Sequence, residues 1–178
     1  KYWETIAPKY ETEIFDVLRN DTSGSIVAAI EEMASPDKTV MDIGCAVGKW
    51  IPVLAPKFKH VIAADISAKN LQIAKEKYPE YENVEYSRMD FSADDLTVTP
   101  CDAAICINAI LTGSLEKRIN FFQSLSLCLH SRGELVLVVP SLESKLYTNI
   151  IADRWNVDDA DNDKPPAGRD AIKKVHNI

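Results

Sequence analysis

Two glycines, Gly44 and Gly48, enclose the segment of this chain that is best suited to bind a ligand. They lie at the two ends of the loop 44–48, which follows a short apolar stretch and precedes a helical pattern. Glycines at the corners of such a loop let the backbone approach a ligand closely, and the start of the following helix favours negative charge. Asp42, two residues before the loop, fits beside an ammonium or sulfonium cation better than beside phosphates, because like charges repel. The alternative is that the glycines only form a tight turn.

Two further acidic residues follow apolar, strand-like segments. Asp65 lies 21 residues after Gly44, where a carboxylate can accept hydrogen bonds from both hydroxyls of a ribose. Asp90 could accept from an exocyclic amine, and Phe91 beside it could offer a ring face to a flat base. Asp90 could instead be a simple helix cap. Together these residues predict a ligand that contains ribose and adenine.

The loop does not match the pattern that binds dinucleotides. That pattern, G-x-G-x-x-G, is needed because the pyrophosphate must lie against the start of the helix. Here the second glycine position is Ala46 and the third is Lys49. This disfavours an NAD-dependent oxidoreductase, which we keep as the less favoured alternative. A ligand with ribose and adenine but no pyrophosphate does not need the third glycine.

The elements that must position these residues alternate between strand and helix. Strand-like segments without a polar face predict an α/β fold, a doubly wound, mostly parallel sheet with helices on both faces. Ligands bind such sheets at the carboxyl ends of the strands, near the point where strand order reverses, which also makes Asn108 a candidate. An Asn at the end of a strand can equally bond only loop backbone. We expect strands at 39–43, 60–65, 84–89, 102–107 and 134–139. We expect helices at 9–19, at 25–35, from about 49, at 67–78, from 114 to a stop at Gly133, and from 141. The expected N-caps are Ser25, Ser67, Ser114 and Ser141.

Composition limits the classes of protein and partner. Of the 178 residues, 46% are apolar and 26% charged, which is typical of a globular domain. The formal net charge of −7 argues against an extended nucleic-acid surface or binding to an anionic membrane. No apolar run approaches the roughly 20 residues of a membrane-spanning helix. The four cysteines lack metal-binding spacing, so we expect no metal and a reduced, cytoplasmic protein; they are Cys45, Cys101, Cys106 and Cys128.

Taken together, the motifs resemble those of class I S-adenosylmethionine-dependent methyltransferases, small-molecule enzymes of the type 11 or type 12 kind in particular. The resemblance covers roughly residues 1–156, with five segments in order: 40–48, Asp65, 90–91, 102–108 and 129–141. It implies S-adenosylmethionine as cofactor and S-adenosylhomocysteine as product. The cofactor site that we expect on this basis comprises Asp42, Gly44, Cys45, Ala46, Gly48, Asp65, Ile66, Asp90, Phe91, Asn108, Tyr10 and Trp3.

The resemblance also suggests an organisation of the chain. Residues 1–36 are expected to form an N-terminal helical lid, residues 37–156 the cofactor-binding core and residues 157–178 a polar tail. In the lid, Trp3 and Tyr10 are candidates for cofactor or substrate contact, although aromatic residues at such positions can also be core or hinge residues. Enzymes of this family complete the sheet with strands six and seven, which the sequence up to residue 178 does not supply. We therefore expect the chain to be a piece of a longer methyltransferase.

The expected reaction is in-line displacement that moves a methyl group to an O or N atom of a small-molecule acceptor. Catalysis would come mostly from proximity and orientation, and the sequence identifies no general base. The segment 108–111 reads Asn-Ala-Ile-Leu and lacks the Pro-Pro-aromatic loop of enzymes that flip nucleic-acid bases. A catalytically silent, methyltransferase-like subunit that binds a partner protein is the competing hypothesis. Neither the acceptor nor the oligomeric state follows from the sequence.

Overall fold

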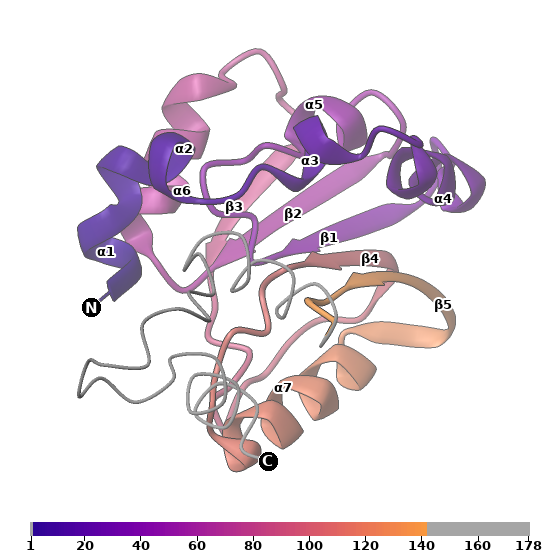
Figure 1. The fold of residues 1–178 in the computed structure, drawn as a ribbon. Coiled ribbons are helices and arrows are strands. Elements are labelled where there is room, and N and C mark those ends of the chain that lie inside the picture. The colour runs from indigo at the N-terminus through magenta and orange to yellow at the C-terminus, as the bar shows by residue number, and fades with distance from the viewer. Residues whose placement is uncertain (1, 142–178) are drawn as a thin grey trace, which may run out of the picture.

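The structure, a computed structural model, describes residues 2–141 and contains a five-stranded parallel sheet (Figure 1). The strand order is β3-β2-β1-β4-β5, so the order reverses between β1 and β4. This confirms the doubly wound α/β fold that the alternation of strands and helices predicts. The strands are β1 (Thr39–Ile43), β2 (His60–Asp65), β3 (Val84–Arg88), β4 (Cys101–Ile107) and β5 (Leu129–Val138).

Helices cover both faces of the sheet (Figure 1). On one side, Ile30, Ile51 and Leu71 of three different helices pack in one buried cluster. On the other, Phe121 and Met41 belong to a second buried cluster. The helical elements are α1 (Tyr2–Ile6), η1 (Ala7–Lys9), α2 (Tyr10–Glu13), α3 (Val17–Asn20), α4 (Ser25–Met33), α5 (Ile51–Leu54), α6 (Ala68–Lys77) and α7 (Leu115–Leu127).

The N-terminal part differs from the continuous helix expected over 9–19. Helix α2 ends at Glu13, the backbone is extended at Ile14 and Asp16, and α3 begins only at Val17. Asp16 is the N-cap of α3, because its side chain accepts a hydrogen bond from the N–H of Arg19. A local cap therefore interrupts the helical pattern.

The start of α4 corrects a second expectation. Ser25 is the first residue of the helix and not its N-cap, a position that Gly24 occupies with a φ of +67°. The cap is supplied by Asp21, whose carboxylate accepts from the N–H groups of Ser25, Ile26 and Val27. One side chain thus satisfies three of the free N–H groups at the helix start. Ser67 and Ser114, by contrast, cap α6 and α7 as predicted.

Helix α7 and strand β5 correct a third expectation. The helix ends at Leu127, whereas Gly133 lies within β5. Strand β5 pairs with β4 at Leu129 and again from Glu134, and Gly133 lies in the irregular stretch between the two pairings. The helical spacing of Leu115, Ile119, Phe122 and Leu125 predicts one apolar face of α7, but of these four only Leu125 is buried. The buried face is formed instead by Phe121, Ser124 and Leu125.

Some expectations fall outside the described residues. These are the helix from 141, the missing strands six and seven and the polar tail 157–178. Within residues 2–141, no helix is long and apolar enough to cross a membrane.

Candidate functional site

The loop between β1 and α5 has a backbone that only a few residue types adopt. Gly44 and Gly48 have φ angles of +74° and +78°, and Ala46 between them has +48°. The N–H groups of Gly44 and Cys45 both donate to the carbonyl of Ala64 at the end of β2, at 2.8 and 3.0 Å. Left-handed backbone costs an alanine about 1–2 kcal/mol, so this part of the loop is held in place by its neighbours.

The two glycines have different reasons for lacking a side chain. A Cβ at Gly44 would lie 2.4 Å from the Cβ of Ala109, which belongs to the segment after β4. A Cβ at Gly48 would lie 2.6 Å from Ile51 Cδ1 and 3.0 Å from Ala74 Cβ. Gly44 therefore lets two strand ends approach each other at the switch point, whereas Gly48 lets the loop pack against its own helix and α6.

Asp65 is held at the end of β2 by three hydrogen bonds. Its Oδ2 accepts from the N–H of Ala46 at 2.9 Å, and its Oδ1 accepts from Ser67 N at 2.8 Å and from Asn70 Nδ2 at 3.3 Å. Burial raises the pKa of Asp65, and the hydrogen bonds from Ser67, Ala46 and Asn70 work in the opposite direction. Asp65 lies at the edge of a cavity, with 7% of its surface exposed.

Asp42 is a buried carboxyl group with an incomplete set of partners. It is 2% exposed, and its Oδ2 has no hydrogen-bond partner among the described residues. Burial, and to a smaller extent the charge of Asp65, raises the pKa of Asp42 to about 8. A buried carboxylate without a partner is costly. The group therefore holds a proton at neutral pH, or it calls for a cationic ligand.

Asp90 and Phe91 follow β3. The Oδ1 of Asp90 accepts from the N–H and the hydroxyl of Ser92, at 2.9 and 2.6 Å, so this side chain orders its own turn and does not cap a described helix. Phe91 is 4% exposed and packs against Phe121, with ring centroids 5.6 Å apart. Phe91 is thus a core residue and also part of a cavity wall.

Asn108 combines the two roles that its position at the end of a strand suggests. Its φ is +53°, and its backbone N–H donates to Val138 O at 2.9 Å, which ties the end of β4 to β5. It also lines two cavities at this edge of the sheet.

These two adjoining cavities, each of about 170 Å³, lie at the carboxyl ends of the strands. The first is bordered by residues that follow β1, β2, β3 and β4, and the second extends from the β1 loop toward residues 14–18. Gly48 lines neither cavity, and Asp42 and Cys45 line the second. The predicted residues that line the first cavity are Trp3, Tyr10, Gly44, Ala46, Asp65, Ile66, Asp90, Phe91 and Asn108.

The N-terminal segment, residues 2–20, lies against the rim of these cavities, and its elements α1 and η1 lie beside α6 (Figure 1). Trp3 and Tyr10 line both cavities and have ring centroids 6.5 Å apart. Burial raises the pKa of Tyr10 to about 12, with the negative charges of Asp65 and Asp42 adding to the effect. Tyr10 therefore stays a neutral hydrogen-bonding group over the physiological pH range.

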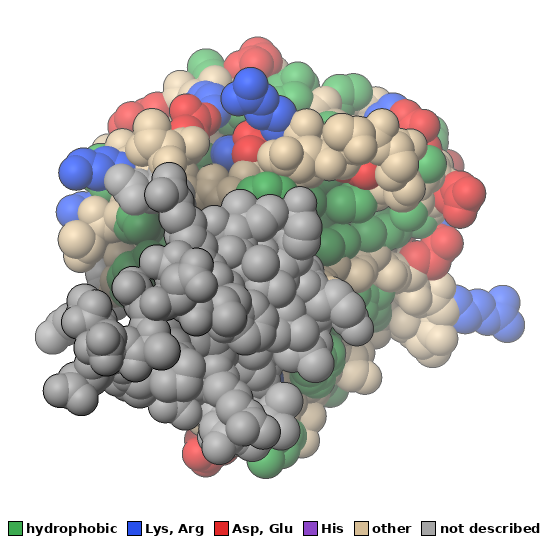
Figure 2. All heavy atoms as spheres, viewed as in Figure 1, with side chains coloured by type: hydrophobic (Ala, Val, Ile, Leu, Met, Phe, Trp, Pro, Cys, Tyr) green, Lys and Arg blue, Asp and Glu red, His purple; other side chains and the backbone are tan. Residues whose placement is uncertain are grey.

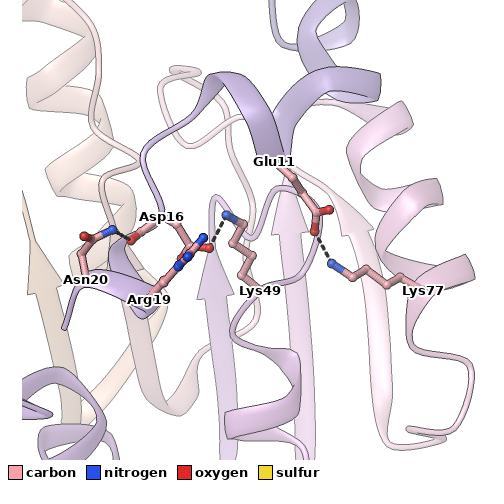
Figure 3. A network of polar contacts seen from close by, with 6 residues as sticks. All are labelled: Glu11, Asp16, Arg19, Asn20, Lys49 and Lys77. Carbon is pink, nitrogen blue, oxygen red and sulfur yellow. Dashed lines mark hydrogen bonds and ion pairs between the residues drawn. The ribbon is translucent and has the colours of Figure 1, made fainter. Parts of the chain in front are cut away.

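Acidic side chains attach the N-terminal segment at three places. Glu4 accepts from the N–H of Ala68 at 2.8 Å, at the start of α6, where negative charge is favourable. Glu11 pairs with Lys77 near the end of α6, and Asp16 pairs with Lys49 of the β1–α5 loop (Figure 3).

The remaining chemistry of the site is limited. Cys45 is buried, and burial together with the charge of Asp42 raises the pKa of its thiol, which argues against a nucleophilic role. Within residues 2–141, no group of three His, Cys, Asp or Glu side chains could hold a metal ion.

Comparison with known proteins adds the family to this geometry. Residues 40–133, more than half of the chain, match the model of a family described as "Methyltransferase domain". The chain belongs to this methyltransferase domain family. The matched range begins in β1 and ends in β5. It therefore contains the segments after β1 and β4 that line both cavities. Outside this range lie residues 2–20, which supply Trp3 and Tyr10.

Individual relatives of the methyltransferase domain are distant. It is 27% identical over 124 residues to ribosomal RNA small subunit methyltransferase A of Thermotoga petrophila. That match spans 66% of this chain and 46% of the relative, so the chain spans about half the length of that protein.

Solved structures show the same fold at low sequence identity. The DhpI–SAM–HEP complex has a TM-score of 0.65 and 17% identity, with 92% of this chain and 70% of that chain covered. Phosphoethanolamine N-methyltransferase 1 of Haemonchus contortus has a TM-score of 0.61 and 19% identity, with 82% of this chain and 33% of that one covered. These likenesses confirm the Rossmann-like fold of the methyltransferase domain.

Sequence reasoning missed several residues of the site. Asn70 donates to Asp65 and has its own Oδ1 buried without a hydrogen-bond partner. Its place three residues after the capping Ser67 was the only signal, and that spacing suggests a cap more than a site. Asp16 and Lys49 lie 33 positions apart, so no local pattern could have paired them.

Proposed function

We propose that this chain is the catalytic part of an S-adenosylmethionine-dependent methyltransferase. The observation that carries the proposal is Asp42, a buried carboxyl group with an unpartnered oxygen at the wall of a cavity. The cofactor contains an ammonium and a sulfonium, and a positive charge of this kind would be the partner that this oxygen lacks. The adenosine part fits the first cavity, where Asp65 and Asp90 offer oxygens and Phe91 offers a ring. Structural neighbours described as complexes with SAM or SAH support the choice of cofactor.

The residues of the site would act by binding and orientation. When bound, S-adenosylmethionine supplies a methyl group activated by its sulfonium. Asp65 would accept from the ribose hydroxyls, while its bonds from Ala46 and Ser67 fix the carboxylate in place. Gly44 and Ala46 leave room beside the backbone, and Trp3 and Tyr10 limit the access of water from the N-terminal side. In-line transfer needs such alignment more than a general base, and we assign no base.

We propose a small molecule as the methyl acceptor. The relative from Thermotoga petrophila is named for ribosomal RNA, so RNA is the competing acceptor. Binding to RNA depends on lysines and arginines that neutralise phosphates. In the face that Figure 2 shows, basic side chains are scattered among acidic ones over the described part of the chain, and the formal net charge of the whole chain is −7. Two cavities of about 170 Å³ each suit a small acceptor better.

A silent subunit and an NAD-dependent oxidoreductase have less support. A catalytically silent subunit has no need for Asp42 and Asp65 beside a cavity. An NAD-dependent oxidoreductase would place a pyrophosphate where Ala46 and Lys49 stand instead of glycines. We also propose a cytoplasmic location, on the ground that the four cysteines are free and buried.

Calorimetric titration with S-adenosylhomocysteine and with NAD tests the proposal. We expect the wild type to bind S-adenosylhomocysteine at micromolar concentration and Asp65→Ala to weaken this binding at least about tenfold, because it removes the ribose acceptor. Asp37→Ala is the matched control, since Asp37 is exposed and lines neither cavity. Preference for NAD, or no binding of S-adenosylhomocysteine, contradicts the proposal.

A further inference from the structure

The second cavity brings side chains of both charges together. Among the described residues that line either cavity, Lys49 is the sole lysine or arginine, and it lines the second. The same cavity is lined by Asp16 and by Asp42, the buried carboxyl group with an unpartnered oxygen. A wall that carries charges of both signs is complementary to a ligand group that also carries both.

The proposed cofactor has such a group at one end. In S-adenosylmethionine, an ammonium and a carboxylate are attached to the same carbon atom. The proposed function places the ammonium at Asp42, which lines the second cavity and not the first. The carboxylate must then enter the second cavity as well, where burial without a countercharge or hydrogen-bond donors would be costly.

The backbone of the β1–α5 loop has few N–H groups left for this carboxylate. Backbone N–H groups hold the anion in glycine-rich phosphate-binding loops. Here, four N–H groups of the loop already donate hydrogen bonds within the protein. They belong to Gly44, Cys45, Ala46 and Gly48. The countercharge for a carboxylate in the second cavity therefore has to come from a side chain, and Lys49 carries that charge.

The present partner of Lys49 is a carboxylate that can be exchanged. Lys49 Nζ lies 2.8 Å from Asp16 Oδ2, and 17% and 31% of the two side chains are exposed (Figure 3). The other oxygen, Asp16 Oδ1, accepts from the N–H of Arg19 and caps α3. Loss of Lys49 would leave this cap in place and Asp16 in contact with water. Because ion pairs with access to solvent add little to stability, Lys49 can change its partner at small cost.

We propose that Lys49 binds the carboxylate of S-adenosylmethionine and that Asp16 competes with this carboxylate for Lys49. The inference rests on the proposed function, because it assigns a further residue to the cofactor named there. Before the cofactor binds, Asp16 supplies the countercharge and joins the N-terminal segment to the β1–α5 loop. In the complex the cofactor carboxylate replaces Asp16 at Nζ, so the negative charge of Asp16 weakens binding.

The test compares two ligands that differ in this carboxylate alone. Decarboxylated S-adenosylmethionine keeps the sulfonium and the ammonium of S-adenosylmethionine and lacks only the carboxylate. Both are titrated into the protein by calorimetry at pH 7. We expect the wild type to bind S-adenosylmethionine about tenfold or more tightly than the decarboxylated ligand, because only the former pairs with Lys49.

Variants of the two partners should change affinity in opposite directions. Lys49→Met removes the ammonium and keeps an apolar stem, so it should weaken S-adenosylmethionine about tenfold and leave the decarboxylated ligand within about twofold. Asp16→Asn keeps an N-cap acceptor but removes the competing charge, so it should tighten S-adenosylmethionine about threefold or more. Lys49→Arg retains a cation and should keep the wild-type preference above about threefold.

A second ion pair of the same type provides the matched control. Lys57 and Glu31 are paired at 2.9 Å, and neither lines a cavity. Lys57→Met and Glu31→Gln should therefore leave the affinity for both ligands unchanged. An effect of these variants equal to that of Lys49→Met and Asp16→Asn would mean that the net charge of the protein, and not Lys49, sets the preference, and would overturn the inference.

Three further results would overturn the inference while S-adenosylmethionine still binds to the wild type. The first is equal affinity of the wild type for both ligands. The second is an equal loss of both ligands in Lys49→Met, which would show that Lys49 only supports the structure of the site. The third is failure of Asp16→Asn to tighten S-adenosylmethionine. If the wild type does not bind S-adenosylmethionine at all, the proposed function fails, and the inference fails with it.

Discussion

The carboxylate of Asp65 accepts a hydrogen bond from the backbone N–H of Ala46, with 2.9 Å between Oδ2 and N. This bond connects the end of β2 to the residue of the β1–α5 loop that has a left-handed backbone. The same carboxylate faces the first cavity. Asp65 therefore both shapes the loop and lines the cavity, so that loss of its side chain should affect both.

Ala46→Gly should stabilise the domain. Ala46 has a φ of +48°, a conformation that glycine adopts without strain. We expect a gain of about 0.5–1 kcal/mol in the free energy of unfolding, measured by urea denaturation. Ala55→Gly, at a position with a right-handed helical φ of −57°, is the control and should destabilise. An equal decrease in the free energy of unfolding in both variants would show that glycine does not release the strain at Ala46.

Gly44→Ala should disrupt the site, because its Cβ would lie 2.4 Å from Ala109 Cβ. We expect loss of about 2 kcal/mol or more in stability and loss of S-adenosylhomocysteine binding. Ala109→Gly removes the clashing atom, so the double variant should regain part of the stability but keep the strain of the positive φ. Absence of any rescue in thermal denaturation would refute the clash as the cause.

Asp42 should make the ligand-free protein less stable as pH rises. Its pKa is raised to about 8 in the folded state, above the value of about 3.9 for an unfolded chain. The folded state thus binds more protons between these values, and the free energy of unfolding falls as pH rises from about 4 to about 8. Asp42→Asn removes this dependence.

The measurement is the melting temperature of wild type and Asp42→Asn at several pH values. The melting temperature of Asp42→Asn minus that of the wild type should increase by about 3 °C or more from pH 5 to pH 9. Parallel curves for the two proteins would mean that Asp42 is ionised throughout.

Asn70 should support the site through Asp65. Its Nδ2 donates to Asp65 Oδ1 at 3.3 Å, so Asn70→Ala should leave the carboxylate less well oriented. We expect S-adenosylhomocysteine affinity to fall about threefold to tenfold in calorimetry. Gln72→Ala, an exposed change on the same helix, should leave affinity unchanged; an equal effect of both variants would point to the helix and not to Asn70.

The parts of the fold that the sequence predicts are those fixed by local patterns. Strands β1, β2 and β4 are apolar on both faces, so their length and their place in a parallel sheet follow from the pattern alone. Because the carboxyl ends of parallel strands meet at one edge, Gly44, Asp65 and Asp90 could be expected to meet there. The structure brings all three to the first cavity.

The parts that could not be predicted depend on contacts between distant residues. The pattern over 9–19 is helical, but the cap at Asp16 and its pairing with Lys49 interrupt it. Gly133 resembles a helix stop, yet pairing of β5 with β4 begins earlier, at Leu129. Propensity is overridden in both places by interactions that the local sequence does not show.

The protonation state of Asp42 provides the most direct test of cofactor binding. At pH 7 the carboxyl group, with a pKa of about 8, holds a proton in the free protein. Pairing with the ammonium of S-adenosylmethionine favours its ionised form, so binding should release up to about one proton. Calorimetry in two buffers of different ionisation enthalpy measures this number.

For the wild type at pH 7, we predict binding of S-adenosylmethionine with net proton release, and for Asp42→Asn at least about tenfold weaker binding without it. Absence of binding by the wild type, or binding that Asp42→Asn leaves unchanged in affinity and proton release, would contradict the proposed function.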